Sequence, residues 1–222
     1  MIMGITVGIF GTNCYIYSED DKNCIIIDPG GDEDLIISQV EENNLIPAGI
    51  ALTHGHLDHV ASLGKLIAYY KNKGIDIKFV IHEKDSKSVG KDSNEYHKSG
   101  LVKLGFANFD SIFKDSFKSF PEADFFIKEG DNIFNMDLTV IETPGHTEGC
   151  VCLYSKSMRI LFSGDTLFNS GVGRTDLPGG DIKSLFDSIK TKIFKLPDET
   201  RVYPGHGPDT TIGREKNSNP FF

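Results

Sequence analysis

The sequence predicts a mixed α/β or α+β fold for a chain of 222 residues. Three observations carry this prediction. Short runs rich in Ile, Val, Tyr and Phe open the chain, segments with helical spacing then mix with further strand-like runs, and no low-complexity linker interrupts them. The missing linker favours one domain over residues 1–222, with an insert at about 83–128.

The first half of the chain predicts strands that alternate with two helices. Strands are expected at residues 5–10, 14–17 and 24–27. Asp32 is placed to cap a helix whose apolar residues are Leu35, Ile36 and Val40. A short buried strand at 49–53 delivers His54 at its end, and the next apolar residues recur at helical spacing: Val60, Leu63, Gly64, Ile67 and Ala68.

The insert at 83–128 follows a strand at 78–81 and breaks this regularity. It mixes Lys, Asp and Ser with five phenylalanines: Phe106, Phe109, Phe113, Phe117 and Phe120. This composition is atypical of a solvated loop, so we expect the insert to act as a flap or packing surface beside the site. His97 is expected to be solvent-exposed, and His82 is expected to be structural or to support the site without binding metal.

The second half predicts strands between 125 and 154, at 159–162 and at 201–203. Asp181 is expected to cap the last clear helix, and the apolar face of that helix is Ile182, Leu185, Phe186, Ile189 and Ile193.

Composition narrows the class of protein. A net charge of −9 without a basic run disfavours a nucleic-acid surface. No apolar stretch approaches the ~20 residues of a membrane span, and the N-terminal residues lack the features of a signal peptide. The four cysteines lie in apolar, strand-like runs, so we expect them to be reduced and buried. These features indicate a cytoplasmic, soluble protein.

The segment from Thr53 to His59 carries the strongest chemical signal. It places His54, His56, Asp58 and His59 directly after a strand, with Gly55 allowing the backbone to turn. Imidazole and carboxylate groups are ligands for ions of the zinc class. The alternative is a polar loop with surface histidines. It would not explain why three of the chain's seven histidines lie so close to an aspartate in the sequence.

Three more candidate ligands follow strand-like runs later in the chain. His146 and His206 each follow Pro-Gly, and Asp165 follows Ser-Gly. A single Pro-Gly-His is more often a turn than a ligand, but together with the first cluster these positions indicate a shared metal-binding crevice.

The motif His-x-His-x-Asp-His, followed by separate His, Asp and His at strand ends, resembles the metallo-β-lactamase superfamily over nearly the whole chain. The resemblance implies an αββα sandwich of two facing mixed β-sheets with helices outside. It also implies that His54, His56 and His146 hold one metal, that Asp58, His59 and His206 hold the other, and that Asp165 bridges them.

Finer residues are similar to the glyoxalase II branch of this superfamily. Asp165 stands where β-lactamases typically carry Cys or lack a bridging carboxylate, and His56 stands where flavodiiron proteins carry Glu. The loop at 168–176 and the ending from 204 resemble the short bacterial hydroxyacylglutathione hydrolases, although the chain lacks the C-terminal helical region of the longer glyoxalases. Arg174 in that loop either binds a substrate carboxylate or pairs with Asp176 or Asp181.

These residues predict a metal-dependent hydrolase that cleaves a small-molecule thioester such as S-lactoylglutathione. Two divalent ions would supply the hydroxide, and Asp58 would orient it as the catalytic residue. Zinc is favoured, with iron or manganese as alternatives, because nitrogen and oxygen ligands suit all three. The competing hypothesis is an iron-dependent persulfide dioxygenase. An RNA-processing nuclease is disfavoured by charge, and a non-enzymatic binding protein by the complete ligand set.

Overall fold

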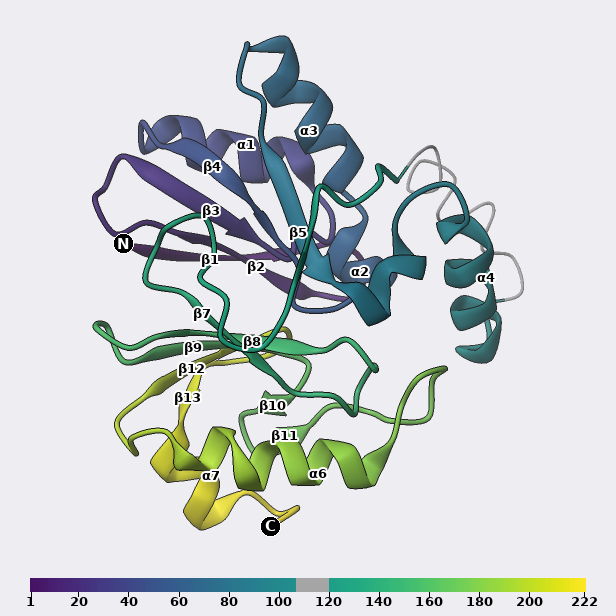
Figure 1. Ribbon diagram of the computed structural model, residues 1–222, viewed down its shortest axis with the longest axis vertical. Helices are drawn as coiled ribbons and strands as arrows, with labels where there is room; N and C mark the ends of the chain where they lie inside the picture. The colour runs from purple at the N-terminus through teal and green to yellow at the C-terminus, as the bar shows by residue number, and fades with distance from the viewer. Residues whose placement is uncertain (107–119) are drawn as a thin grey trace.

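The computed structural model describes residues 1–106 and 120–222. Two β-sheets face each other, α1 and α3 cover the outer face of one sheet, and α6 and α7 cover the outer face of the other (Figure 1). This arrangement confirms the αββα sandwich. None of the helices within these residues is long and apolar enough to cross a membrane.

The first sheet has six strands in the order β1-β2-β3-β4-β5-β6. Its strands are β1 (Ile2–Val7), β2 (Thr12–Tyr17), β3 (Asn23–Ile27), β4 (Ile46–Ala51), β5 (Lys78–His82) and β6 (Phe125–Ile127). The first three pair antiparallel, and β3 to β6 pair in parallel. Strand β1 ends earlier than predicted because the chain turns at Gly8 and Gly11, both of which have positive φ.

The second sheet has five strands in the order β13-β12-β9-β8-β7. Its strands are β7 (Thr139–Glu142), β8 (Val151–Ser155), β9 (Ile160–Gly164), β12 (Arg201–Pro204) and β13 (Thr210–Thr211). Strands β9 and β12 run in parallel and the other pairs are antiparallel. A separate hairpin joins β10 (Leu167–Phe168) to β11 (Gly171–Val172).

The predicted helices are present, but Leu35 and Ile182 of their predicted apolar faces are exposed. They are α1 (Glu33–Glu42), α2 (Leu57–Val60), α3 (Leu63–Asn72), α4 (Ser93–Lys103), α6 (Ile182–Thr191) and α7 (Ile212–Ser218), with 3₁₀ turns η1 (Glu83–Ser88) and η2 (Ile193–Lys195). The predicted helix after His59 is divided into α2 and α3, because the Ser62 backbone nitrogen donates to the Pro29 carbonyl instead of continuing α2. Helices α4 and α7 were not predicted from the sequence.

The two predicted caps have different outcomes. The Asp181 carboxylate accepts a hydrogen bond from the Ser184 nitrogen at 2.7 Å, which confirms it as the cap of α6. Asp32 does occupy the N-cap position of α1, but its side chain makes no capping hydrogen bond. Its carboxylate instead accepts a hydrogen bond from the Gly8 nitrogen at 2.8 Å.

Three apolar clusters follow from the alternation of side chains along the strands. Ile25 and Ile27 of β3 point between the sheets, whereas Cys24 and Ile26 point toward α1 and α3. A third cluster joins the outer face of the second sheet to α6 and α7. All four cysteines are buried and unbonded to one another, as predicted.

The insert contains η1, α4 and β6 among its described residues. Phe106 and Phe120 pack on the cluster beneath α1 and α3. Phe109, Phe113 and Phe117 lie outside the described residues.

Candidate metal centre

The seven predicted ligand residues lie together at one end of the sandwich. His54 follows β4, and the chain then turns into α2, which carries Asp58 and His59 in its first turn. The turn needs Gly55, because a Cβ there would lie 2.2 Å from the Ser88 hydroxyl. Because the segment turns into a helix instead of continuing as a strand, His59 lies on the same side as His54.

The second sheet supplies the other three residues from the loops after its strands. His146 lies between β7 and β8, Asp165 follows β9, and His206 follows β12. The loop of His206 approaches very closely at Gly205, where an added Cβ would lie 2.2 Å from Asp165 Oδ1 and 2.8 Å from His59 Cε1. Glycine is therefore required beside this histidine by close packing.

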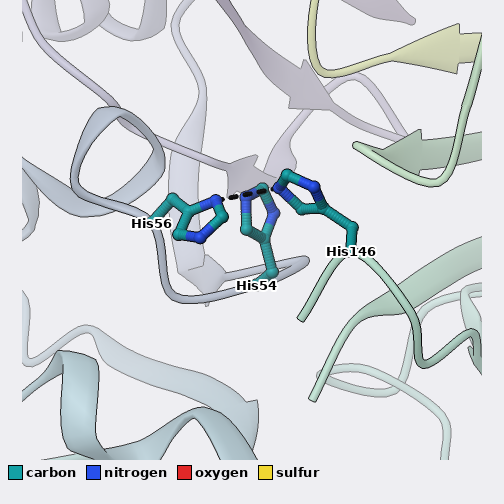
Figure 2. Close-up of side chains that lie close together, drawn as sticks. All are labelled: His54, His56 and His146. Atoms are coloured by element: carbon teal, nitrogen blue, oxygen red, sulfur yellow. Dashed lines mark hydrogen bonds between the residues drawn. The ribbon is translucent and has the colours of Figure 1, made fainter. Parts of the chain in front are cut away.

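The potential ligand atoms form three overlapping groups, and within each group they lie no more than 4.8 Å apart. The groups are His54 with His56 and His146, His54 with His59 and Asp165, and Asp58 with His59 and His206. Figure 2 shows the first group, whose three rings converge from the His54 loop and the His146 loop. Asp165 lies between the other residues: its Oδ2 is 3.4 Å from His146 Nε2 and 3.6 Å from His206 Nε2.

Hydrogen bonds fix which nitrogen of His54 faces the centre. The Thr53 hydroxyl donates to Asp28 Oδ2 at 2.6 Å, so it must accept from His54 Nδ1 at 3.1 Å. This places the proton on Nδ1 and leaves the lone pair of Nε2 pointing inward. Burial, reinforced by the neighbouring histidines, lowers the pKa of His54 well below its ordinary value, so the ring is neutral.

His146 is oriented in the same way by a backbone carbonyl. Its Nδ1 donates to the Arg174 carbonyl oxygen at 2.7 Å, and its Nε2 lies 2.8 Å from Nδ1 of His56 (Figure 2). Burial and the proximity of His146 also lower the pKa of His56. His54 and His56 are therefore neutral, which is the form of histidine that binds metal.

Carboxylates surround His59 on the other side of the centre. Its Nδ1 lies 3.0 Å from Asp28 Oδ2, and its Nε2 lies 3.5 Å from Asp165 Oδ1 and 3.6 Å from Asp58 Oδ2. Burial opposes protonation, but the three carboxylates outweigh it and raise the pKa of His59 to about 10. The local potential therefore strongly favours positive charge.

Asp58 is held by two neighbours that come from different sheets. Its Oδ2 accepts a hydrogen bond from the Thr12 hydroxyl at 2.9 Å and lies 3.2 Å from His206 Nε2. Burial opposes ionisation, but His59 and His206 hold the pKa of Asp58 well below its usual range. The side chain is therefore a carboxylate that can accept hydrogen bonds but not donate them.

The donor set fits divalent metal ions. His54 Nε2, His59 Nε2 and Asp165 Oδ1 are buried and have no hydrogen-bond partner among residues 1–106 and 120–222. Buried polar atoms normally have a partner, because leaving one unsatisfied costs on the order of 1–3 kcal/mol. An ion bound to these atoms would satisfy them and would neutralise the adjacent carboxylates.

A cavity of about 600 Å³ opens above these residues. His56, Asp58, His146, Asp165 and His206 form its polar floor. Leu101 of α4 and Leu104, which directly follows this helix, contribute to one wall, so the insert does lie at the mouth of the site. Whether it moves as a flap stays a prediction.

Comparison with known proteins decides the family. The family model described as "Metallo-beta-lactamase superfamily" matches residues 7–206. The chain belongs to the metallo-β-lactamase superfamily. Among curated superfamily members, it is 36% identical to the hydroxyacylglutathione hydrolase GloC of Haemophilus influenzae, over 98% of this chain and 96% of that protein.

Two solved superfamily structures resemble it along the full chain. The B3 metallo-β-lactamase BLEG-1 has a TM-score of 0.85 and 34% identity, covering 100% of this chain and 99% of that one. TTHA1623, solved in a di-iron-bound form, has a TM-score of 0.78 and 33% identity, covering 99% and 100%. The chain is thus a member of a metallo-hydrolase superfamily, with clusters of His and Asp suited to metal.

The prediction that His97 is solvent-exposed is wrong. His97 lies on α4, and the residue is only 3% exposed. Its Nε2 lies 2.8 Å from the Ser88 carbonyl oxygen, and its ring packs on Phe120 with 4.9 Å between centroids. Burial lowers the pKa of His97 to about 4, so it is neutral in the cavity wall.

Arg174 and His82 both have local partners. Arg174 lies at the cavity and forms a bidentate pair with Asp176, with both N···O distances at 2.7 Å. The pairing alternative is therefore observed, while substrate binding stays a prediction. His82 joins β5 to β7 through Glu142, with 3.1 Å between Nε2 and Oε1, and takes no part in the three groups of potential ligands.

Sequence reasoning missed Asp85, which joins the two histidine loops of this superfamily member. Its buried carboxylate accepts hydrogen bonds from the Gly55 nitrogen at 2.9 Å, the Gly149 nitrogen at 2.9 Å and the Thr147 hydroxyl at 2.6 Å. One side chain at the start of the insert thereby fixes the loop of His54 and His56 against the loop of His146. Asp85 lies in a polar stretch with no periodic signal, so nothing in the sequence singled it out.

Proposed function

We propose that this protein is a metal-dependent thioester hydrolase that cleaves S-lactoylglutathione or a related thioester. The observation that carries the proposal is the set of three overlapping His and Asp groups, with Asp165 placed between the others. The name of the Haemophilus influenzae relative supports the choice of a hydroxyacylglutathione ester.

In this proposal His54, His56 and His146 would hold one ion, Asp58, His59 and His206 would hold a second, and Asp165 would contribute to both. When bound, two such ions supply a hydroxide at neutral pH and polarise the thioester carbonyl. Zinc is the favoured ion, and the di-iron form of TTHA1623 supports iron as the alternative.

The chain's own residues position the reacting groups. Thr12 fixes the Asp58 carboxylate, which orients the nucleophile by accepting a hydrogen bond from it. Asp28 and Thr53 keep the Nε2 lone pair of His54 directed inward. The departing thiolate is a good leaving group, so no strong acid is required opposite Asp58.

The competing activity, iron-dependent persulfide oxidation, differs in its need for oxygen and a redox-active ion. We expect zinc-loaded protein to cleave S-lactoylglutathione under anaerobic conditions. The release of glutathione measures this reaction. An iron-loaded form that consumes oxygen with glutathione persulfide, combined with a zinc-loaded form that cleaves no thioester, would replace the hydrolase with the dioxygenase.

A further inference from the structure

The walls of the cavity above the candidate metal centre are apolar on three sides. Leu57 and Phe10 form the first side, and Leu101, Leu104 and Phe106 form the second. The third side is formed by Phe168 and Val172 of the β10–β11 hairpin and by the following segment with Leu177 and Pro178. The rings of Phe10 and Phe106 meet edge to face across the first two sides, with 5.7 Å between centroids.

Positive charge is scarce in these walls. Arg174 is the one lysine or arginine among the described residues that line the cavity, and Asp176 occupies two of its donors. The side chain of Arg174 is 48% exposed, which places its charge at the rim. Of the polar rings on the α4 side, Tyr96 is half-buried and His97 is buried, and burial keeps His97 neutral.

An adjacent hollow offers no better place for an anionic group. It shares Phe10, Leu57 and Asp58 with the cavity. Lys65 is the single lysine or arginine among its described lining residues, and its Nζ pairs with Glu33 at 2.5 Å. Burying a carboxylate without a partner is strongly unfavourable, whereas burying an apolar chain against such walls is favourable.

We infer that the cavity binds an apolar chain attached to the thioester, while any charged arm of the substrate remains at the rim near Arg174. This inference rests on the proposed thioester hydrolysis and specifies its substrate class. The apolar chain of the substrate lies on either the acyl or the thiol side of the thioester carbonyl. The shared chemistry is an extended hydrocarbon of the size that a cavity of about 600 Å³ accommodates.

Two substrate series on the zinc-loaded full chain test this. One lengthens the acyl group from acetyl to octanoyl on N-acetylcysteamine, a neutral thiol. The other keeps an acetyl group and lengthens an alkanethiol from ethyl to octyl. We expect kcat/KM to rise about threefold to fourfold per methylene in one series until the cavity is full, and the series that rises identifies the arm.

Leu104→Glu, with Leu104→Ala as the milder variant, tests the location. Leu104 is partly buried in the cavity wall, whereas Val102 of α4 is 58% exposed and does not line the cavity. Leu104→Glu should reduce the ratio of kcat/KM for the longest to the shortest ester at least tenfold, and Leu104→Ala should reduce it less. The matched control Val102→Glu should leave that ratio unchanged.

The outcomes separate the inference from the function on which it rests. Cleavage of thioesters with no gain from chain length in either series, or an equal loss in Leu104→Glu and Val102→Glu, would overturn the apolar cavity. Failure to cleave any thioester, S-lactoylglutathione included, would instead refute the proposed hydrolase.

Discussion

Asp28 Oδ2 lies 3.0 Å from Nδ1 of His59 and also accepts the hydrogen bond of the Thr53 hydroxyl that orients His54. One buried carboxylate thus controls a histidine in each of the two proposed coordination groups. Asp28 belongs to the Asp-Pro-Gly turn that ends β3, so the first sheet itself supplies this support.

Asp28→Asn should weaken metal binding by about 10-fold to 100-fold, because it removes the charge behind His59 and places an amide against Thr53. Equilibrium titration of the apo protein with a fluorescent zinc competitor measures this. Asp34→Asn, a change of the same kind at an exposed position of α1, is the control. Equal affinities for all three proteins would show that Asp28 does not support the metal-binding residues.

Asp85→Ala should destabilise the apo protein by on the order of 3 kcal/mol, because three buried donors lose their acceptor. Urea unfolding followed by circular dichroism measures the change. Asp85→Asn retains one acceptor oxygen and should lose less. A wild-type unfolding midpoint in Asp85→Ala would contradict the role of this side chain as the joint between the two histidine loops.

Asp58→Ala should lower thioester turnover by at least a hundredfold, through both a weakened second ion and a misplaced hydroxide. Metal content measured on the same samples distinguishes these two causes. Thr12→Val retains the carboxylate and removes only its hydroxyl donor, so its loss should be smaller. Near-normal turnover in Asp58→Ala would refute the proposed role of this residue.

Arg174→Ala should raise KM for a carboxylate-bearing thioester more than it lowers kcat, since it removes binding shared by ground and transition states. Asp176→Asn is the matched variant, because it breaks the same ion pair but leaves the guanidinium available. We expect its KM to stay level or fall. A parallel rise of KM in both variants would show that the ion pair matters for the loop and not for substrate.

Fully loaded protein should contain two metal ions per chain, because seven ligand residues exceed the shell of one four- or six-coordinate ion. Elemental analysis after reconstitution with excess zinc and removal of unbound metal gives the number. A plateau at one ion per chain would show that the second group of residues does not hold an ion. His82→Ala, which removes a histidine outside the cluster, should leave the count unchanged.

The sequence was informative where chemistry and periodicity coincide. His54, His56, Asp58 and His59 stand out as four potential ligands within six residues, and His146, Asp165 and His206 each follow a strand, so all seven candidates could be selected without coordinates. Most β-strands were predicted because short runs of Ile, Val, Tyr and Phe are separated by turn residues. The single-domain count stays a prediction.

The misses have a common physical cause, which is contact between segments distant in sequence. Asp85 works through Gly55 and Gly149, which lie 30 and 64 positions away. The exposure of His97 was predicted wrongly because the sequence of α4 has almost no apolar periodicity. Its burial depends on the residues against which α4 packs. Asp32 has the right residue type for a cap, but its carboxylate accepts a hydrogen bond from the Gly8 nitrogen instead.

The origin of the seven residues in two sheets has a consequence for folding. Neither half of the sandwich alone contains a full set of ligands, since Asp58 and His59 come with the first sheet and His206 with the second. A cation with the proposed ligands therefore binds the assembled state and not the separated halves, and acts as a thermodynamic clamp on their association. At a free concentration 100 times its dissociation constant, such an ion adds about 2.7 kcal/mol to the stability of the folded chain. The supply of metal would then set the lifetime of the folded chain as well as the activity proposed for it.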